Sequence, residues 1–209
     1  RKLRIMIELT EIDKKIIEKS KQYELVCGVD EAGAGCLSGN LVVAAVILDP
    51  DNQIEGLNDS KKLTEKKREE LFPQIIEKAL EYSIISITPK EIDESNILAM
   101  RMEGMKRAVN SLKNVEYALI DGNKLPEGLN VPSDYLIKGD AKSEGIAAAS
   151  ILAKVTRDRQ IVEAAKLYPQ YGFEKHKGYG TKAHKEALQK YGPCEIHRFS
   201  YKPVKESVK

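Results

Sequence analysis

The segment Leu41–Leu48, with the sequence LVVAAVIL, constrains the fold more than any other part of the chain. A strand with one face in water alternates apolar and polar residues, whereas a run that is apolar at every position indicates a strand covered on both faces. The segment is also far too short to cross a membrane. It therefore predicts a sheet that lies between layers of other elements.

Further strands and helices are predicted around this run. The strands are expected at 25–29, 82–87, 117–120 and 135–137, and the helices at 8–21, 64–80, 96–112, 146–167 and 181–191. Strands first, with helices interleaved afterwards, indicate a mixed α/β layered fold with a helical C-terminal end. At 209 residues we expect one compact domain, 23–209, preceded by an N-terminal helical extension, 1–22.

The composition and the cysteine pattern exclude several classes of protein. Hydrophobic residues make up 42% of the chain and charged residues 32%, which is typical of soluble globular proteins. No apolar run approaches the roughly 18 residues that span a bilayer, and the first four residues lack the apolar stretch of a signal peptide. Cys27, Cys36 and Cys194 have no paired spacing, which favours free thiols. We therefore expect a cytoplasmic protein that does not associate with membranes.

The charge is distributed unevenly along the chain. Residues 1–137 are net acidic and residues 138–209 are net basic. This asymmetry fits an acidic catalytic region beside a basic surface for a polyanion, but it also fits ordinary solvated helices.

Acidic residues stand at or just beyond the ends of three predicted strands. Asp30 and Glu31 follow the first, Asp121 follows another, and Asp140 comes shortly after the last. Sites in open α/β sheets gather beyond strand ends, and carboxylates brought together there repel one another without a counter-ion. Two Mg²⁺ ions, which prefer oxygen ligands, would resolve the repulsion and support displacement at a phosphodiester. Each acidic segment taken alone would also fit a turn that faces solvent.

The adjacent pair Asp30-Glu31 presents a geometric problem. Neighbouring residues on a regular strand point to opposite faces, so the two carboxylates cannot both reach one site from such a strand. We therefore expect the strand to twist or end at this pair, with Gly33 and Gly35 in the turn that follows.

Seven ordered blocks of sequence resemble the type 2 ribonucleases H (ribonuclease HII), over about residues 25–205. The blocks are 28–35 (GVDEAGAG), 58–63 (NDSKKL), 120–123 (IDGN), 138–140 (KGD), 147–154 (AAASILAK), 168–173 (YPQYGF) and 176–179 (HKGY). The resemblance implies a ribonuclease H-like α/β fold, a mixed sheet flanked by helices with a small helical C-terminal extension, so that 23–209 would be the catalytic domain. It also implies an endonuclease that depends on Mg²⁺ or Mn²⁺, with two ions per site. Such an enzyme would cleave the RNA strand of RNA/DNA hybrids and incise 5′ of ribonucleotides embedded in duplex DNA, leaving a 3′-OH and a 5′-phosphate.

Site residues are carried over from the resemblance position by position. The catalytic and metal-binding residues would be Asp30, Glu31, Asp121 and Asp140. The predicted substrate-binding residues are Gly33, Ala34, Gly35, Ser60, Lys61, Ser150, Lys154 and Tyr179. Within this set, the glycines would approach the ribose 2′-OH, Tyr179 would stack near the RNA–DNA junction, and Ser60 and Lys61 would contact the backbone of the duplex. The implied partners are hybrid and ribonucleotide-containing duplexes, bound by a monomer.

Ala34 departs from the family pattern, which has Arg between the two glycines. An arginine would offer several donors to phosphate and alanine offers none. The leading hypothesis is a metal-dependent endonuclease. One alternative is a hybrid-binding protein whose turnover or junction selectivity is impaired by Ala34, and another is a junction resolvase that cuts branched DNA.

Several other polar residues are interpreted as structural. Asp158 is expected to be the partner in a surface ion pair, because a continuous helix would place it about 27 Å beyond Asp140. His176, His184 and His197 are scattered along the sequence and are expected to be structural or near phosphate.

Overall fold

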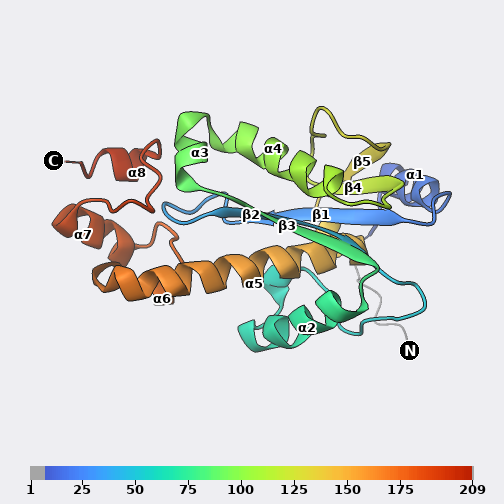
Figure 1. Ribbon diagram of the computed structural model, residues 1–209, viewed down its shortest axis with the longest axis horizontal. Coiled ribbons are helices and arrows are strands. Elements are labelled where there is room, and N and C mark those ends of the chain that lie inside the picture. Colours follow the sequence, from blue (N-terminus) through green and yellow to red (C-terminus); the bar gives the residue numbers. More distant parts are fainter. Residues whose placement is uncertain (1–7, 209) are drawn as a thin grey trace.

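A computed structural model describes residues 8–208, which form one five-stranded sheet with helices on both faces (Figure 1). The strands are β1 (Val26–Ala32), β2 (Leu41–Ile47), β3 (Glu81–Ile87), β4 (Tyr117–Asp121) and β5 (Ser133–Leu136). Their order across the sheet is β3-β2-β1-β4-β5. β1, β2 and β3 pair antiparallel, whereas β4 and β5 run parallel to β1. The mixed sheet predicted from the sequence is confirmed.

The central strand β2 is buried along its whole length, as its apolar sequence predicts. Alternate side chains of β2 enter two different cores. Val43 and its neighbours on that face pack against α4 (Ile97–Asn110), while Val42 and its neighbours pack against α2 (Glu65–Lys78) and α5 (Glu144–Leu167). Figure 1 shows α4 on one side of the sheet and α2 and α5 on the other.

The long helix α5 crosses very close to β1. A Cβ atom on Gly28 would lie 2.0 Å from the carbonyl carbon of Gly145, so only glycine permits this approach. The first half of α5 is rich in alanine, and Ala147, Ala148 and Ala149 are fully buried. Small residues on both elements therefore bring the helix backbone against the strand.

The C-terminal region packs around the far end of α5 as a group of short helices: α6 (Phe173–His176), α7 (Lys182–Tyr191) and α8 (Lys202–Lys205). Leu37, from the loop between β1 and β2, packs against Leu188 and Val204 of this region. The sequence predicted α7 and its stop at Gly192, but it did not reveal α6, α8 or the six-residue α3 (Pro89–Glu94).

The N-terminal helix α1 (Glu11–Ser20) packs at the β5 edge of the sheet. Lys19 pairs with Asp134 of β5 at 2.7 Å, and Asp13 pairs with Lys142 at 2.7 Å. Residues 1–7 of the predicted extension lie outside the described residues, and the boundary at residue 22 stays a prediction. In the part of the chain that the structure describes, no helix is long and apolar enough to span a membrane.

The strand β1 is longer than expected from the sequence. It runs through Asp30 and Glu31 to Ala32, so of the two alternatives expected for the acidic pair, a twist or the end of the strand, the second is wrong. The reason is long-range pairing: Asp30, Glu31 and Ala32 lie opposite three apolar residues of β2, which continue the antiparallel ladder past the two charges.

Candidate active site

Asp30 and Asp121 are neighbours at one edge of the sheet. In the parallel pairing of β1 with β4, Val29 lies opposite Ile120, so the residues that follow them are side by side. Asp140 arrives from a 3₁₀ turn, Gly139–Ala141, just after β5. The Asp121 carboxylate accepts a hydrogen bond from the backbone N–H of Gly139 at 2.6 Å, which ties this turn to the end of β4.

Glu31 reaches the same cluster from the other face of β1. Because side chains alternate along a strand, Asp30 lies on the α5 face with Gly28, and Glu31 lies on the α4 face. Burial is the largest cause that raises the pKa of both carboxyl groups, and the charge of Asp121 raises each of them further. The adjacent pair therefore stays on opposite faces of β1, and the charge of Asp121 acts on both carboxyl groups.

All four carboxyl groups have a raised pKa. Burial is the largest cause in each, and repulsion from other carboxylates adds to it for Asp30, Glu31 and Asp140. For Asp121, burial outweighs the backbone N–H groups of Gly139 and Asp140, which lower its pKa. The pKa of Asp140 rises to about 6, through burial and then through the charges of Asp121 and Asp59. A protein pays this electrostatic cost at sites that bind cations or perform chemistry more often than elsewhere.

Two cationic side chains face the cluster. Burial lowers the pKa of Lys61, but the charges of Asp30 and Asp140 outweigh this effect and raise it. Arg101 of α4 pairs with Glu31 at 2.6 Å. Sequence reasoning missed Arg101, although a signal existed: it lies four residues from Ile97 and four from Met105, on a helix face that is otherwise apolar.

The donor set suits a hard divalent cation. It consists of carboxylate oxygens, and one of them, Oε2 of Glu31, is buried without a hydrogen-bond partner among the described residues. Within residues 8–208, however, no three acidic, histidine or cysteine side chains already stand in an arrangement that would hold a metal. Binding an ion would therefore require side-chain rotation, chiefly of Glu31, whose other oxygen is held by Arg101.

The predicted turn 33–35 follows β1 directly and is held from behind by arginines. Gly33 has φ +92°, and a Cβ atom there would lie 2.1 Å from Nε of Arg157. The carbonyl oxygen of Ala34 accepts hydrogen bonds from Arg198 at 3.0 Å and from the Tyr201 hydroxyl at 2.6 Å. A Cβ atom on Gly35 would meet no described atom within 4 Å, so this glycine has space on its outer side.

Ser60 and Ser150 are both buried. The Ser150 hydroxyl donates to the carbonyl of Ala147 at 2.8 Å and accepts from the backbone N–H of Ser60 at 3.3 Å. The structure therefore places Ser150 behind the turn that carries Ser60 and Lys61, where it supports the turn from the inside.

A second group of side chains lies near the end of the turn that follows β1. It consists of Lys154, Asp158 and Tyr179. Lys154 pairs with Asp158 at 2.9 Å, and its Nζ lies 5.5 Å from the centre of the Tyr179 ring. Asp158 is an ion-pair partner as expected, but at 8% exposure it is buried, so its expected surface position is wrong. Arg157, also buried, lies 5.8 Å from the same ring, and the ring is 43% exposed.

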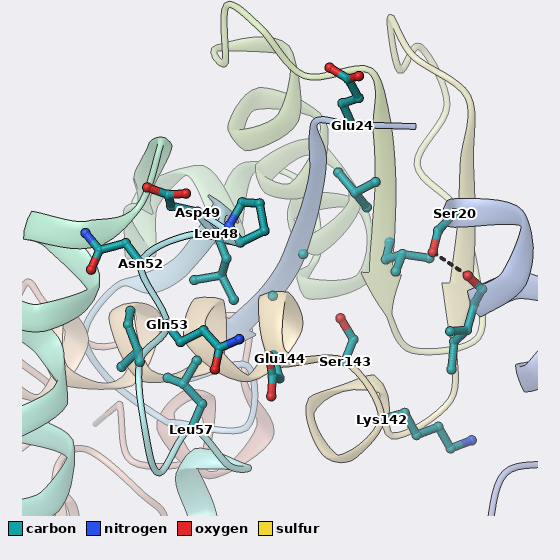
Figure 2. Close-up of a pocket in the computed structure, with 17 residues that line it drawn as sticks. Ser20, Glu24, Leu48, Asp49, Asn52, Gln53, Leu57, Lys142, Ser143 and Glu144 are labelled. Atoms are coloured by element: carbon teal, nitrogen blue, oxygen red, sulfur yellow. Dashed lines mark hydrogen bonds between the residues drawn. The ribbon is translucent and has the colours of Figure 1, made fainter. Parts of the chain in front are cut away.

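A cavity of about 490 Å³ lies elsewhere in the molecule, around the start of α5 and the loop after β2. Figure 2 shows Leu48, Asn52, Gln53, Ser143 and Glu144 around it. None of the predicted site residues lines this cavity. The carboxylate cluster thus stands outside the cavity, as a site for a large, surface-bound substrate would.

Comparison with known proteins decides the family. The family model described as ribonuclease HII matches residues 27–204, which include all four carboxylates and Tyr179. The chain belongs to the ribonuclease HII family. Ribonuclease HII of Idiomarina loihiensis is 57% identical over 182 residues, covering 87% of this chain and 97% of the relative. That of Vibrio parahaemolyticus is 54% identical over 192 residues, covering 91% and 90%. As a ribonuclease HII, the chain is an endoribonuclease.

A solved relative confirms the fold. The crystal structure of ribonuclease H2 from Pyrococcus horikoshii matches with a TM-score of 0.76 and 33% identity, over 88% of this chain and 97% of that one. The ribonuclease H-like fold expected from the resemblance is thus correct.

Proposed function

We propose that this ribonuclease HII is a metal-dependent endonuclease that cleaves the RNA strand of RNA/DNA hybrids and incises 5′ of ribonucleotides embedded in duplex DNA. The observation that carries the proposal is the carboxylate cluster. Asp30, Glu31, Asp121 and Asp140 come from β1, β4 and the turn after β5, and each has a raised pKa. The family model and the relatives carry the name ribonuclease HII, which supports the same assignment.

In this proposal the cluster holds two Mg²⁺ or Mn²⁺ ions. Asp30 and Asp121 would contact both ions because they are neighbours at the strand edge, while Glu31 and Asp140 would each complete one. When bound, such ions activate water and stabilise in-line displacement at the phosphate, which leaves a 3′-OH and a 5′-phosphate. Lys61 lies close to the same carboxylates and would attract the phosphate backbone into place.

The residues that distinguish RNA from DNA would lie in the turn after β1. The 2′-OH is the group that differs between the two, and a backbone free of side chains can approach it closely. Gly33 keeps its left-handed conformation against Arg157, and Gly35 has open space outside it. Tyr179, exposed and set between glycines, would stack on a sugar or base beside the scissile phosphate, with Lys154 beneath the ring.

Cleavage of a labelled duplex that contains one ribonucleotide tests the proposal. In Mg²⁺ or Mn²⁺ we expect a nick 5′ of the ribonucleotide, with a 3′-OH that a DNA polymerase can extend. EDTA or Asp30→Asn should abolish the nick, and an all-DNA duplex of the same sequence is the matched control. Cleavage that persists in EDTA, or equal cleavage of the all-DNA duplex, would contradict the proposal. Cutting of a branched all-DNA junction alone would favour the resolvase alternative.

The same duplex distinguishes an active endonuclease from the alternative, a hybrid-binding protein whose turnover is impaired. Retention of the duplex on a native gel without cleavage would favour the binding protein. Ala34→Arg should then raise affinity or junction selectivity, because it adds donors to phosphate at the turn. If Ala34→Arg leaves cleavage of this duplex unchanged, the residue at position 34 does not limit recognition.

A further inference from the structure

The segment that carries Tyr179 is held at every carbonyl. The carbonyl oxygen of Lys177 accepts from Arg157 at 2.7 Å, and that of Gly178 accepts from the backbone N–H of Leu37 at 2.9 Å. The carbonyl oxygen of Tyr179 accepts from the backbone N–H of Thr181 at 2.8 Å and from Nδ1 of the His184 ring at 2.9 Å. Three different parts of the chain thus hold three consecutive residues, although two of them have left-handed backbone angles.

His184 is itself the end of a chain of hydrogen bonds. Its Nε2 atom lies 3.0 Å from Nε2 of His197, and Nδ1 of His197 lies 3.0 Å from the backbone nitrogen of Cys194. A carbonyl oxygen only accepts, so His184 must carry its hydrogen on Nδ1. Nε2 of His184 is then a bare acceptor, so the hydrogen of His197 is on Nε2, and the bare Nδ1 of His197 accepts the backbone N–H of Cys194; the Cys194 carbonyl oxygen also lies 3.3 Å from this nitrogen. His197 then donates to His184, and every hydrogen in this series of hydrogen bonds meets a lone pair.

The two histidines are enclosed by aromatic rings. Both have 0% exposure. The ring of Phe173 lies 5.5 Å from that of His184 and 5.6 Å from that of His197, and His176 stacks on His184 at 4.4 Å. Burial is the largest cause that lowers the pKa of both to about 4, so both are neutral at physiological pH. A neutral pair with fixed hydrogens is a rigid connection between Cys194 and the Tyr179 carbonyl.

We propose that His184, with its tautomer fixed by His197, is a positioning residue that holds Tyr179 ready for the substrate. The inference rests on the proposed function, in which Tyr179 contacts the duplex. A segment that is already ordered loses less conformational freedom on binding than a free loop does. Loss of the His184 bond leaves the Tyr179 carbonyl with its bond from Thr181 alone, and should therefore weaken substrate binding by roughly 5- to 30-fold, the factor that corresponds to one or two weak interactions.

Two substitutions at position 184 test the roles of the two ring nitrogen atoms separately. His184→Gln places its amide near the former Nε2, so it keeps the partner of His197 and loses the donor to Tyr179. His184→Asn places its amide near the former Nδ1, so it keeps the donor to Tyr179. We expect KM for the one-ribonucleotide duplex to rise roughly 5- to 30-fold in the Gln variant and to change little in the Asn variant, with kcat retained in both. Equal KM in the Gln and Asn variants would overturn the proposal.

A double-mutant cycle with Tyr179→Ala distinguishes positioning from general packing. If His184 acts through Tyr179, His184→Gln should have no further effect on binding of an RNA/DNA hybrid once the tyrosine ring is absent. Additive losses would overturn the proposal. Binding is followed by anisotropy of a labelled hybrid, in the non-cleaving Asp140→Asn background. If Tyr179→Ala alone leaves binding unchanged, the proposed contact of Tyr179 with substrate fails, which is a different result from additivity.

The tautomers can be observed without any variant. The chain has three histidines, and in the full-length protein labelled with ¹⁵N-histidine each gives its own two-bond N–H pattern. His176 has Nε2 2.8 Å from the carbonyl oxygen of Tyr171, so its hydrogen is on Nε2. We expect one Nδ1–H tautomer, that of His184, and two Nε2–H tautomers. Three Nε2–H tautomers would overturn the proposal even if the variants at 184 failed to fold.

Discussion

Replacement of Asp140 by Asn should stabilise the metal-free protein while it abolishes cleavage. Asp140 is only 6% exposed. Burial, followed by the charges of Asp121 and Asp59, raises its pKa to about 6 from the usual 3.8. An ionised carboxyl group in this position therefore costs folding free energy, and the neutral amide of asparagine removes that cost.

The size of the gain follows from the shift in pKa. A difference of about two units corresponds to at most about 3 kcal/mol, at 1.36 kcal/mol per unit. Glu31 and Asp121 in the same cluster are partly exposed, so water screens part of the repulsion and we expect about 1–2 kcal/mol. The folded pKa is raised above the unfolded one, so the cost is fully present above pH 6 and disappears as the pH falls below 4. The gain from Asp140→Asn should follow the same course.

Urea unfolding in EDTA, at pH 7.5 and at pH 4, measures this effect. The variant should have a higher midpoint at pH 7.5 and nearly the same midpoint as the wild type at pH 4. Added Mg²⁺ should stabilise the wild type more than the variant. Asp134→Asn is the matched control: burial raises the pKa of Asp134, but its bonds to Lys19 and Tyr117 outweigh this and lower it, so its loss should destabilise the protein at pH 7.5. If Asp140→Asn is less stable than the wild type in EDTA at pH 7.5, repulsion within the cluster is not the dominant effect.

Three further predictions concern the scaffold of the site. Gly28→Ala should lower the free energy of unfolding in urea by about 1–3 kcal/mol or more, because its Cβ would lie 2.0 Å from the backbone of α5. Gly35→Ala is the control and should change the same quantity by less than about 0.5 kcal/mol. Equal effects of the two substitutions would contradict the close approach of α5 to β1. Arg101→Met should lower the free energy of unfolding by about 1–3 kcal/mol, because it leaves Glu31 unpaired. Adding Glu31→Gln to this variant should restore most of that free energy. If it restores none, the pairing of Arg101 with Glu31 is contradicted. In an NMR titration His184 and His197 should protonate near pH 4, so the stability that they contribute is complete above pH 6.5 and is lost as the pH falls toward 4; midpoints near pH 6.5 would contradict a buried neutral pair.

Local sequence patterns were sufficient for the layered fold and for the proximity of Asp30 and Asp121, whereas the full set of four carboxylates was carried over from the family resemblance. The apolar run of β2 has no polar face, so it could only lie between two layers, and its alternate side chains indeed enter two cores. Asp30 and Asp121 follow neighbouring residues of two apolar strands, and parallel pairing then brings them together. Both inferences depend on residues close together in the sequence or on a simple rule of sheet geometry.

Features that depend on distant partners could not be read in this way. Two adjacent charges with glycines after them predict that a strand twists or ends there, but pairing with β2 continues β1 to Ala32. The histidines are separated by as many as 21 positions in the sequence, from His176 to His197, yet their rings stack or bond in a single cluster. Asp158 is expected at the surface from the sequence, yet it is buried beside its ion-pair partners Lys154 and Arg157 on α5.

The helix α5 connects the carboxylate cluster to the second group, which contains Tyr179, more firmly than the loops between them do. It begins at Glu144, just after the turn that carries Asp140, and packs directly on β1 at Gly28. About 20 Å further along, at 1.5 Å per residue, Arg157 binds the carbonyl groups of Ser38 and Lys177. One buried side chain thus ties the turn after β1 and the Tyr179 segment to the same helix. A glycine on each side of Tyr179 suggests a mobile loop, but its neighbouring carbonyls are bound to α5, to Leu37 and to His184. The separation between the carboxylates and the tyrosine is therefore set by a helix and its bonds, so that in the proposed function an exposed ring on a glycine-rich loop would serve as a fixed contact for a duplex.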